Sequence, residues 1–159
     1  MIRVQSEDFD VGAEIAALRR GNASIGAVAC FIGLVRDLNE DASVSEMSLE
    51  HYPGMTEKAL AEIVAQAKKR WDIYDALVIH RIGALKPTDQ IVLVATTSAH
   101  RHEAFASCEF IMDYLKTRAP FWKKEQTTQG AHWVDARESD ENAMQRWDTD
   151  PACSKRELE

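Results

Sequence analysis

The chain has 159 residues, of which 45% are hydrophobic and 28% charged, and its formal net charge is -7 at pH 7. This length suits one globular domain, and the negative charge argues against a protein that binds nucleic acid by neutralising phosphates. No segment has the apolar core of a signal peptide or approaches the roughly 18 apolar residues of a membrane span. We therefore expect a cytoplasmic protein that contacts neither nucleic acid nor membrane.

The N-terminal part predicts alternating strands and helices. Residues 2–5 are expected to form a strand, and Asp10 to cap a helix that runs to about Arg20. Residues 26–35 are a nearly continuous apolar run rich in β-branched and aromatic side chains, which predicts a strand buried on both faces. The polar residues 37–45 predict a loop before another strand.

The rest of the chain predicts further helices and strands. Apolar residues recur at helical spacing from Met55 to Trp71, which predicts an amphipathic helix. A second helix is expected to begin near His100 and must end by Ala119, because Pro120 disfavours a helical conformation in the residue before it. The other expected elements are strands at 47–51, 74–82, 90–97, 121–125 and 131–135, a turn at 86–89 and a helix at 138–147. This order predicts an α+β fold, with one domain over residues 1–147 and a flexible tail over 148–159.

The three cysteines, Cys30, Cys108 and Cys153, lie far apart and form no Cys-x-x-Cys pair. This spacing argues against a disulfide framework or a thiolate zinc site. Cys30 lies in the apolar run and Cys108 on an apolar helix stripe, so we expect both to be small buried hydrophobic residues.

Four cations surround a proline and two aromatic residues in the segment 112–125: Lys116, Arg118, Lys123 and Lys124. In an acidic chain this cluster indicates a site for a small anion. Two interpretations stay open. The lysines are ordinary surface residues near a helix end, where cations suit the helix dipole. Alternatively, desolvation and like charge lower the pKa of one amine enough for proton transfer or bonding to carbonyl intermediates.

His100 and Arg101 lie at the predicted start of a helix, where free N–H groups and the dipole favour a phosphate. The alternative is that His100 only caps the helix and Arg101 is solvated. His100 and His102 point to different sides of a helix, so we expect no metal site there. Glycine-rich nucleotide motifs and His-Glu-x-x-His are absent.

Several motifs together resemble the large, catalytic subunit of molybdopterin synthase from about Gly26 to Trp147. They are Leu49–Thr56, His80–Gly83, Ser98–Arg101 with Ala104 and Phe105, and Met112–Glu125. The resemblance implies an α/β hammerhead fold, with a mixed or antiparallel sheet packed by helices. Thr88 stands where the family usually has glycine, which leaves the type of that turn open.

The resemblance also implies a sulfurtransferase of molybdenum cofactor biosynthesis. In that family a homodimer of large subunits carries a small ubiquitin-like partner at each end, giving a heterotetramer. The partner's Gly-Gly C-terminus brings a thiocarboxylate, and two sulfurs pass to cyclic pyranopterin monophosphate to form the dithiolene of molybdopterin. No metal or tightly held cofactor is implied.

Residues at the family's pocket positions are Leu34, Val35, Arg36, His100, Arg101, Lys116, Lys123, Lys124, Glu125 and Arg137. By this resemblance Lys116 is the main catalytic group, as general acid and base or as an amine handling acyl and thio intermediates, and Lys123 assists electrostatically. Arg36, His100 and Arg101 suit the cyclic phosphate.

The length of the predicted helix bears on how this pocket is built. His100 and Lys116 would lie about 24 Å apart along its axis, farther than a pterin monophosphate spans. We therefore expect a pocket shared across the dimer, with Lys116, Lys123 and Arg36 from one subunit and His100, Arg101 and Arg137 from the other.

Two other functions stay open. One is a non-catalytic module that docks the acidic or C-terminal carboxylate tail of a partner on residues 116–124. The other is a persulfide sulfurtransferase that uses Cys108 or Cys30, although their apolar settings disfavour reactive thiolates.

Overall fold

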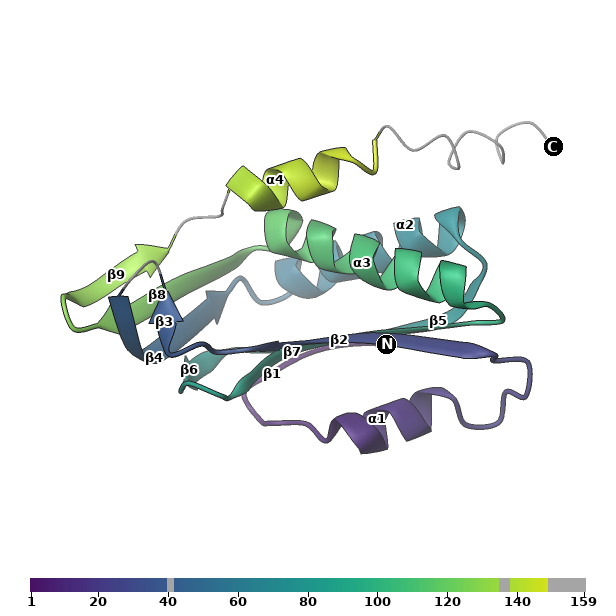
Figure 1. The fold of residues 1–159 in the computed structure, drawn as a ribbon, viewed down its shortest axis with the longest axis horizontal. Coiled ribbons are helices and arrows are strands. Elements are labelled where there is room, and N and C mark those ends of the chain that lie inside the picture. The colour runs from purple at the N-terminus through teal and green to yellow at the C-terminus, as the bar shows by residue number, and fades with distance from the viewer. Residues whose placement is uncertain (40–41, 135–137, 149–159) are drawn as a thin grey trace.

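The computed structural model describes residues 1–39, 42–134 and 138–148 (Figure 1). The strands are β1 (Ile2–Gln5), β2 (Ala27–Leu34), β3 (Leu38–Asn39), β4 (Ala42–His51), β5 (Ile73–Arg81), β6 (Gly83–Leu85), β7 (Gln90–Ser98), β8 (Phe121–Thr127) and β9 (Gly130–Val134). The helices are α1 (Val11–Leu18), α2 (Met55–Arg70), α3 (Arg101–Arg118) and α4 (Glu138–Gln145). The α+β prediction is confirmed.

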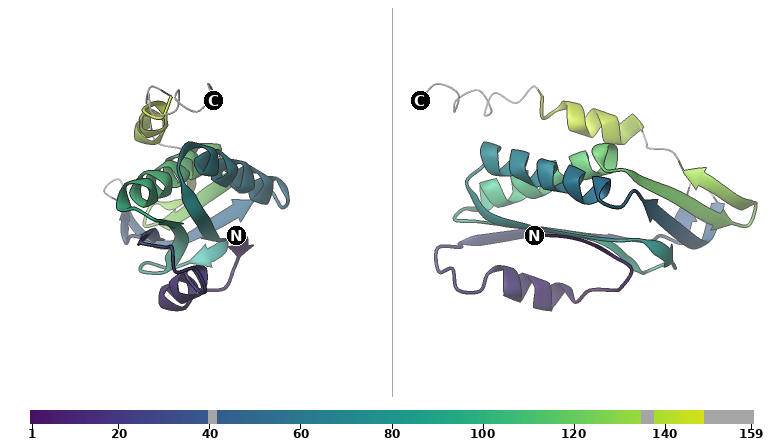
Figure 2. Two further views of the ribbon diagram at one scale, coloured as in Figure 1. Left: turned by 90° about the vertical axis from the view of Figure 1, so that its right-hand side faces the viewer. Right: turned by 180° about the vertical axis from the view of Figure 1, so that it is seen from behind.

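A four-stranded sheet in the order β1-β5-β7-β2 forms the middle layer. β1 runs parallel to β5, and the other neighbours are antiparallel. Helices α2 and α3 cover one face and α1 covers the other, while α4 lies on the outer side of α3 (Figures 1 and 2). The two faces of the sheet therefore have separate cores.

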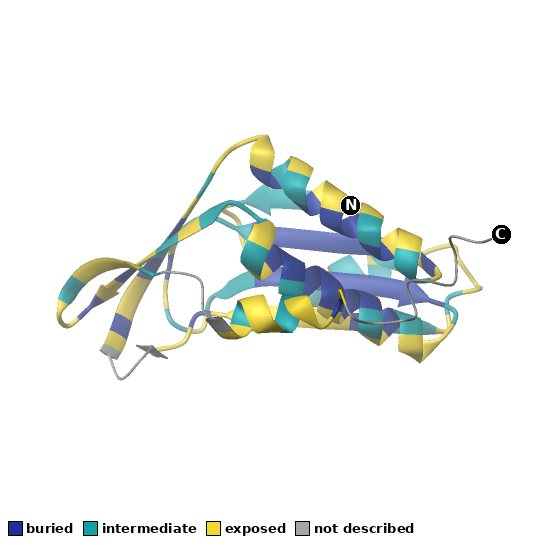
Figure 3. Ribbon diagram, turned by 90° about the horizontal axis from the view of Figure 1, so that it is seen from above, coloured by how far each residue is buried: buried dark blue, intermediate teal, exposed yellow. Residues whose placement is uncertain are grey.

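The larger core lies between the sheet and the helices α2 and α3, where buried residues face one another across the layers (Figure 3). Leu60, Phe110 and Ile111 are fully buried there. The apolar spacing that predicted α2 supplies one wall of this core, and the stripe on α3 supplies the other. A smaller core joins Phe9 to Leu77 and Leu93 beneath α1.

A second sheet lies at one end of the molecule, with strand order β3-β4-β8-β9 and β6 paired to β4 (Figure 1). In β8, Phe121, Lys123 and Glu125 lie opposite His51, Leu49 and Met47 of β4. Alternation along a strand puts these side chains on one face. This face looks toward the C-terminal end of α3 and forms a wall of the site described below.

Three expectations about strands are wrong. β2 was predicted to be buried on both faces, but it is an edge strand in which Phe31 is 43% exposed and Leu34 52% exposed. Cys30, on the same strand, is exposed as well. The predicted loop 37–45 contains β3 and the start of β4, and β6 was not expected. Each error has the same cause, because burial and strand pairing here depend on strands that are distant in the sequence.

The helix ends follow the sequence signals closely. Asp10 caps α1, because its Oδ1 accepts a hydrogen bond from the Ala13 N–H at 2.9 Å. α3 ends at Arg118, with Ala119 in an extended conformation before Pro120. In the turn at 86–89, Thr88 has a φ of 77°, a left-handed conformation that favours glycine.

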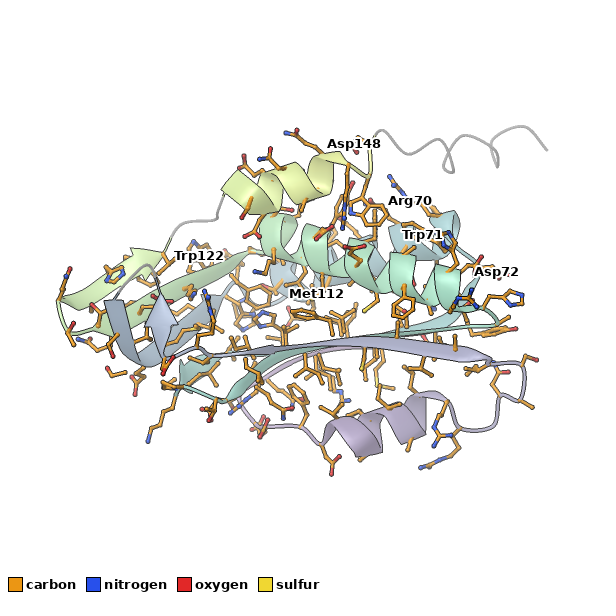
Figure 4. All side chains as sticks on the ribbon, viewed as in Figure 1. Arg70, Trp71, Asp72, Met112, Trp122 and Asp148 are labelled. Carbon is orange, nitrogen blue, oxygen red and sulfur yellow. The ribbon has the colours of Figure 1, made fainter. Side chains whose placement is uncertain are left out.

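The last helix is fixed to the core by Trp147. Its Nε1 donates to Asp113 Oδ2 at 2.7 Å, and its backbone oxygen accepts from Arg70 at 2.9 Å. The Trp147 ring meets Trp71 and Phe110 edge-on, with Arg70 and Trp71 labelled in Figure 4. The predicted tail falls outside the described residues from 149 onward.

Candidate functional site

A cavity of about 580 Å³ opens where the two sheets meet the C-terminal end of α3. Its walls come from the end of β2, from β4, β5, β7, β8 and β9, from α3 and from α4. Met112, labelled beneath α3 in Figure 4, lines it together with Leu115. The volume lies in the range of ordinary small-molecule sites.

The structure brings five of the predicted pocket residues to this cavity: Leu34, Arg36, Lys116, Lys123 and Glu125. They come from three separate parts of the chain, and the fold alone places them together. Val35 does not line the cavity. It is 3% exposed and packs behind it with Met47, Leu49 and Leu85.

Lys123 and Glu125 form an ion pair inside the cavity, with 2.7 Å between Lys123 Nζ and Glu125 Oε1. They are two residues apart on β8 and therefore share a face. Glu125 is only 2% exposed, and a buried carboxylate needs a cation or hydrogen-bond donors to offset its desolvation. The pair holds the Lys123 amine at a fixed place in the wall.

Lys116 lies in the last turn of α3 and is more open to solvent. Its Nζ is 3.9 Å from Asp140 Oδ1 on α4, and the Lys116 side chain is 53% exposed. The negative end of the α3 dipole favours a cation here. Asp140 also lines the cavity, so α4 contributes a carboxylate that the sequence did not reveal.

The remaining predicted residues lie elsewhere or outside the described part of the chain. Lys124 points to the outer face of β8, with its Nζ 5.5 Å from the centre of the exposed Trp133 ring. His100 occupies the N-cap position of α3 without a side-chain cap hydrogen bond, and Arg101 is the first residue of the helix, so both lie at the end opposite Lys116. Arg137 falls in the undescribed residues 135–137.

His80 is a cavity residue that sequence reasoning did not select. It lies on β5, is 5% exposed, and its ring stacks on Phe121 with centroids 3.7 Å apart. Burial lowers the pKa of His80 to about 4, although its bond to the Arg81 carbonyl acts in the opposite direction. The sequence did carry a signal, because His80 belongs to one of the motifs that support the resemblance.

Cys30 and Cys108, the cysteines within the described residues, are both free thiols. Cys108 is buried as expected, and burial raises the pKa of its thiol to about 12. Cys30 is exposed on the edge strand, which contradicts its predicted burial. Both line a second hollow of about 590 Å³ that shares Lys116 and Asp140 with the first. A thiol held protonated is a poor nucleophile, so Cys108 is unsuited to carry a persulfide.

Two further features concern residues 1–39, 42–134 and 138–148. No group of three or more His, Cys, Asp or Glu residues there is placed to hold a metal ion. In the same ranges, no helix has the length and apolar character needed to cross a bilayer.

Residues 4–118 match the family model described as MoaE protein. A "Molybdopterin synthase catalytic subunit" from Ralstonia nicotianae is 73% identical over 92% of this chain and 83% of that protein. A solved "Molybdopterin biosynthesis MoaE protein" from Burkholderia ambifaria is 60% identical, with a TM-score of 0.81, over 94% of this chain and 99% of that one.

A molybdopterin synthase structure from Staphylococcus aureus is 31% identical, with a TM-score of 0.77, and covers 84% of this chain and 96% of that one. The similarity therefore extends over most of the sequence and over the fold. It confirms the resemblance that the motifs indicated. The chain belongs to the MoaE protein family, whose members include molybdopterin synthase catalytic subunits.

Proposed function

We propose that the chain is the catalytic subunit of a cytoplasmic molybdopterin synthase and transfers sulfur in molybdenum cofactor biosynthesis. The relatives' shared name supports this activity. The observation that carries the proposal is the cavity in which Lys116, Lys123 and Arg36 converge beside the buried Glu125. The positive charges of these groups suit a substrate that carries a phosphate and whose oxygen atoms are replaced by sulfur.

The sulfur donor in this proposal is the C-terminal thiocarboxylate of a small ubiquitin-like partner. The word "subunit" in the relatives' names supports a multi-subunit enzyme. In each transfer the C–S bond of the thiocarboxylate and a C–O bond of cyclic pyranopterin monophosphate break, and a bond forms between that sulfur and that carbon. The displaced oxygen leaves as water or as the phosphate oxygen of the opened ring, and a water molecule adds its oxygen to the partner's acyl carbon. The partner's acyl carbon ends as an ordinary carboxylate, and two such transfers give the dithiolene.

The two lysines take different parts in this step. Lys123 is held by Glu125 and supplies a fixed positive charge near oxygens that gain negative charge in the transition state. Lys116 is more exposed and lies farther from its carboxylate. It is therefore the group proposed to give and take protons, or to accept the acyl group as an amine.

We infer that each site is completed by a second copy of the chain. His100 and Arg101 lie beside the start of β2, since Ala27 pairs with Ser98, whereas Arg36 follows the end of β2. Two β2 edges placed antiparallel about a two-fold axis would bring the start of one against the end of the other. The copy's His100 and Arg101 would then lie near Arg36.

The surface of β2 supports this arrangement. Phe31, Ile32 and Leu34 are exposed apolar side chains on an edge strand, and Phe105 of α3 is 68% exposed near them. Apolar edge strands are normally covered or paired, because they otherwise template aggregation. Covering by a second copy would remove this apolar surface from water and complete the cavity.

The proposed unit is one domain over residues 1–147 followed by the tail 148–159. Trp147 supports this boundary because it is 7% exposed and belongs to the main core.

Reconstitution tests the activity directly. The chain would be incubated with the thiocarboxylated partner and cyclic pyranopterin monophosphate, and molybdopterin would be measured. An enzyme should produce it with the wild-type chain and lose almost all turnover with Lys116→Ala at unchanged thermal stability. A docking module would bind the partner and yield no product, which would contradict the proposal.

Mixed dimers test the shared site. After subunit exchange, inactive Lys116→Ala and Arg101→Ala chains should form heterodimers with one intact site and regain a substantial part of the activity. The matched control mixes Lys116→Ala with Lys123→Ala. These two lysines line the same cavity, so this heterodimer has no intact site and should stay inactive. Equal outcomes for the two mixtures would contradict a composite site.

A further inference from the structure

His80 presents a hydrogen-bonding group to the cavity that the mechanism above does not use. The residue belongs to β5, is 5% exposed and lines the cavity. Its Nδ1 lies 2.8 Å from the carbonyl oxygen of Arg81. A carbonyl oxygen only accepts hydrogen bonds, so the imidazole proton of the neutral ring lies on Nδ1 in this contact.

This tautomer leaves Nε2 with a lone pair. Among the hydrogen bonds of the described residues, none involves His80 Nε2. The ring is held in place by its stack on Phe121, with an interplanar angle of 17°. Burial and the nearby His51 both favour the neutral form, in which Nε2 accepts rather than donates. The fully buried polar atoms without a partner do not include Nε2, and His80 lines the cavity, so a ligand there can reach this acceptor.

The other polar groups of the cavity have different chemistry. Arg36, Lys116 and Lys123 are donors and suit phosphate, carbonyl or thiocarboxylate oxygens. The carboxylates of Asp140 and Glu125 are paired with the two lysines. His80 is thus a neutral acceptor among charged groups, and it suits an uncharged N–H donor.

We propose that His80 Nε2 accepts a hydrogen bond from an amide-type N–H of the bound ligand and so positions it for sulfur transfer. This inference rests on the proposed function. Two groups in that reaction carry such an N–H: the lactam and amino edge of the pterin, and the peptide backbone of the partner's Gly-Gly tail. The chemistry is the same, and the two sources are separated by experiment.

A matched pair of variants tests the role of Nε2. His80→Gln places an amide oxygen near the position of Nε2 and gives up the bond to Arg81. His80→Asn can keep a donor near the position of Nδ1 and removes the acceptor at Nε2. We expect His80→Asn to weaken ligand binding about tenfold and His80→Gln to stay within about threefold of wild type, as for the loss of one neutral hydrogen bond.

Binding would be measured in two arms. One titrates cyclic pyranopterin monophosphate into the large subunit alone, and the other titrates the partner with and without its last two glycines. A loss in the first arm assigns the N–H to the pterin. A loss confined to the partner with intact glycines assigns it to the tail. A purely structural His80 would show the opposite ranking, with Asn better tolerated than Gln, and would overturn the inference.

Two controls separate this inference from other failures. Thermal unfolding shows whether each variant folds, and His80→Leu replaces His80→Asn if the latter does not. Wild-type molybdopterin formation tests the proposed function independently. If the wild type is active and neither arm responds to loss of the acceptor, the role of His80 is wrong while the proposed function stands.

Discussion

Protonation of His80 should make the protein lose stability in acid. The pKa of this buried imidazole is about 4 in the folded chain, against an ordinary value of 6.5. As pH falls below 6.5, the unfolded chain takes up the proton first, so the free energy of unfolding falls until pH 4 and then levels off. Between pH 7.5 and 4.5 this linkage amounts to about 2.5 kcal/mol.

The assay is urea unfolding at both pH values, with wild type and His80→Gln at one fixed protein concentration, since the stability of the proposed dimer would depend on concentration. Carboxylates titrate in both proteins, and only the wild type carries the imidazole. The wild type should therefore lose about 2.5 kcal/mol more than the variant over this interval. Equal losses would show that the folded protein binds this proton near the ordinary pKa, and would refute the linkage.

Three further predictions concern the turn, the core and the ion pair. Thr88→Gly should raise the free energy of unfolding by about 0.5–1 kcal/mol, because Thr88 has a φ of 77°; a lower melting temperature would contradict this. Leu60→Ala should cost about 2–5 kcal/mol in denaturant unfolding, as Leu60 is 0% exposed, and a cost below about 1 kcal/mol would contradict close packing there. A double-mutant cycle with Lys123→Met and Glu125→Gln should give a coupling of about 1–3 kcal/mol, and additive effects would show that the 2.7 Å contact contributes nothing.

Local signals were enough for the helices and for most strands. The spacing of apolar residues fixed α2, and Pro120 fixed the end of α3, because both signals act through neighbouring residues along the chain. β2 shows the limit of this reasoning. Its apolar run predicted burial, but whether such a run lies in a core or on an unpaired edge depends on strands far away in sequence.

The candidate site likewise contains residues that the sequence could indicate and residues that only the fold reveals. The resemblance supplied Lys116, Lys123 and Arg36, and the two-residue spacing of Lys123 and Glu125 places both on one face of a strand. The chemistry of His80 was hidden, because it depends on the Phe121 ring that covers it. Asp140 was also missed, since nothing in its polar helix marks it as a partner of a distant lysine.

The strand order of the first sheet has a consequence for how the chain folds during synthesis. β1 pairs with β5, and β2 pairs with β7, so the first two strands find their partners only within residues 73–98. Helix α1 depends on the same region, because Phe9 packs with Leu77 and Leu93. β5 and β7 can form their antiparallel pair as soon as both have left the ribosome. The N-terminal segments, including the apolar β2, stay without partners until β5 and β7 have paired. The nascent chain is therefore most exposed to aggregation before Ser98 leaves the ribosome.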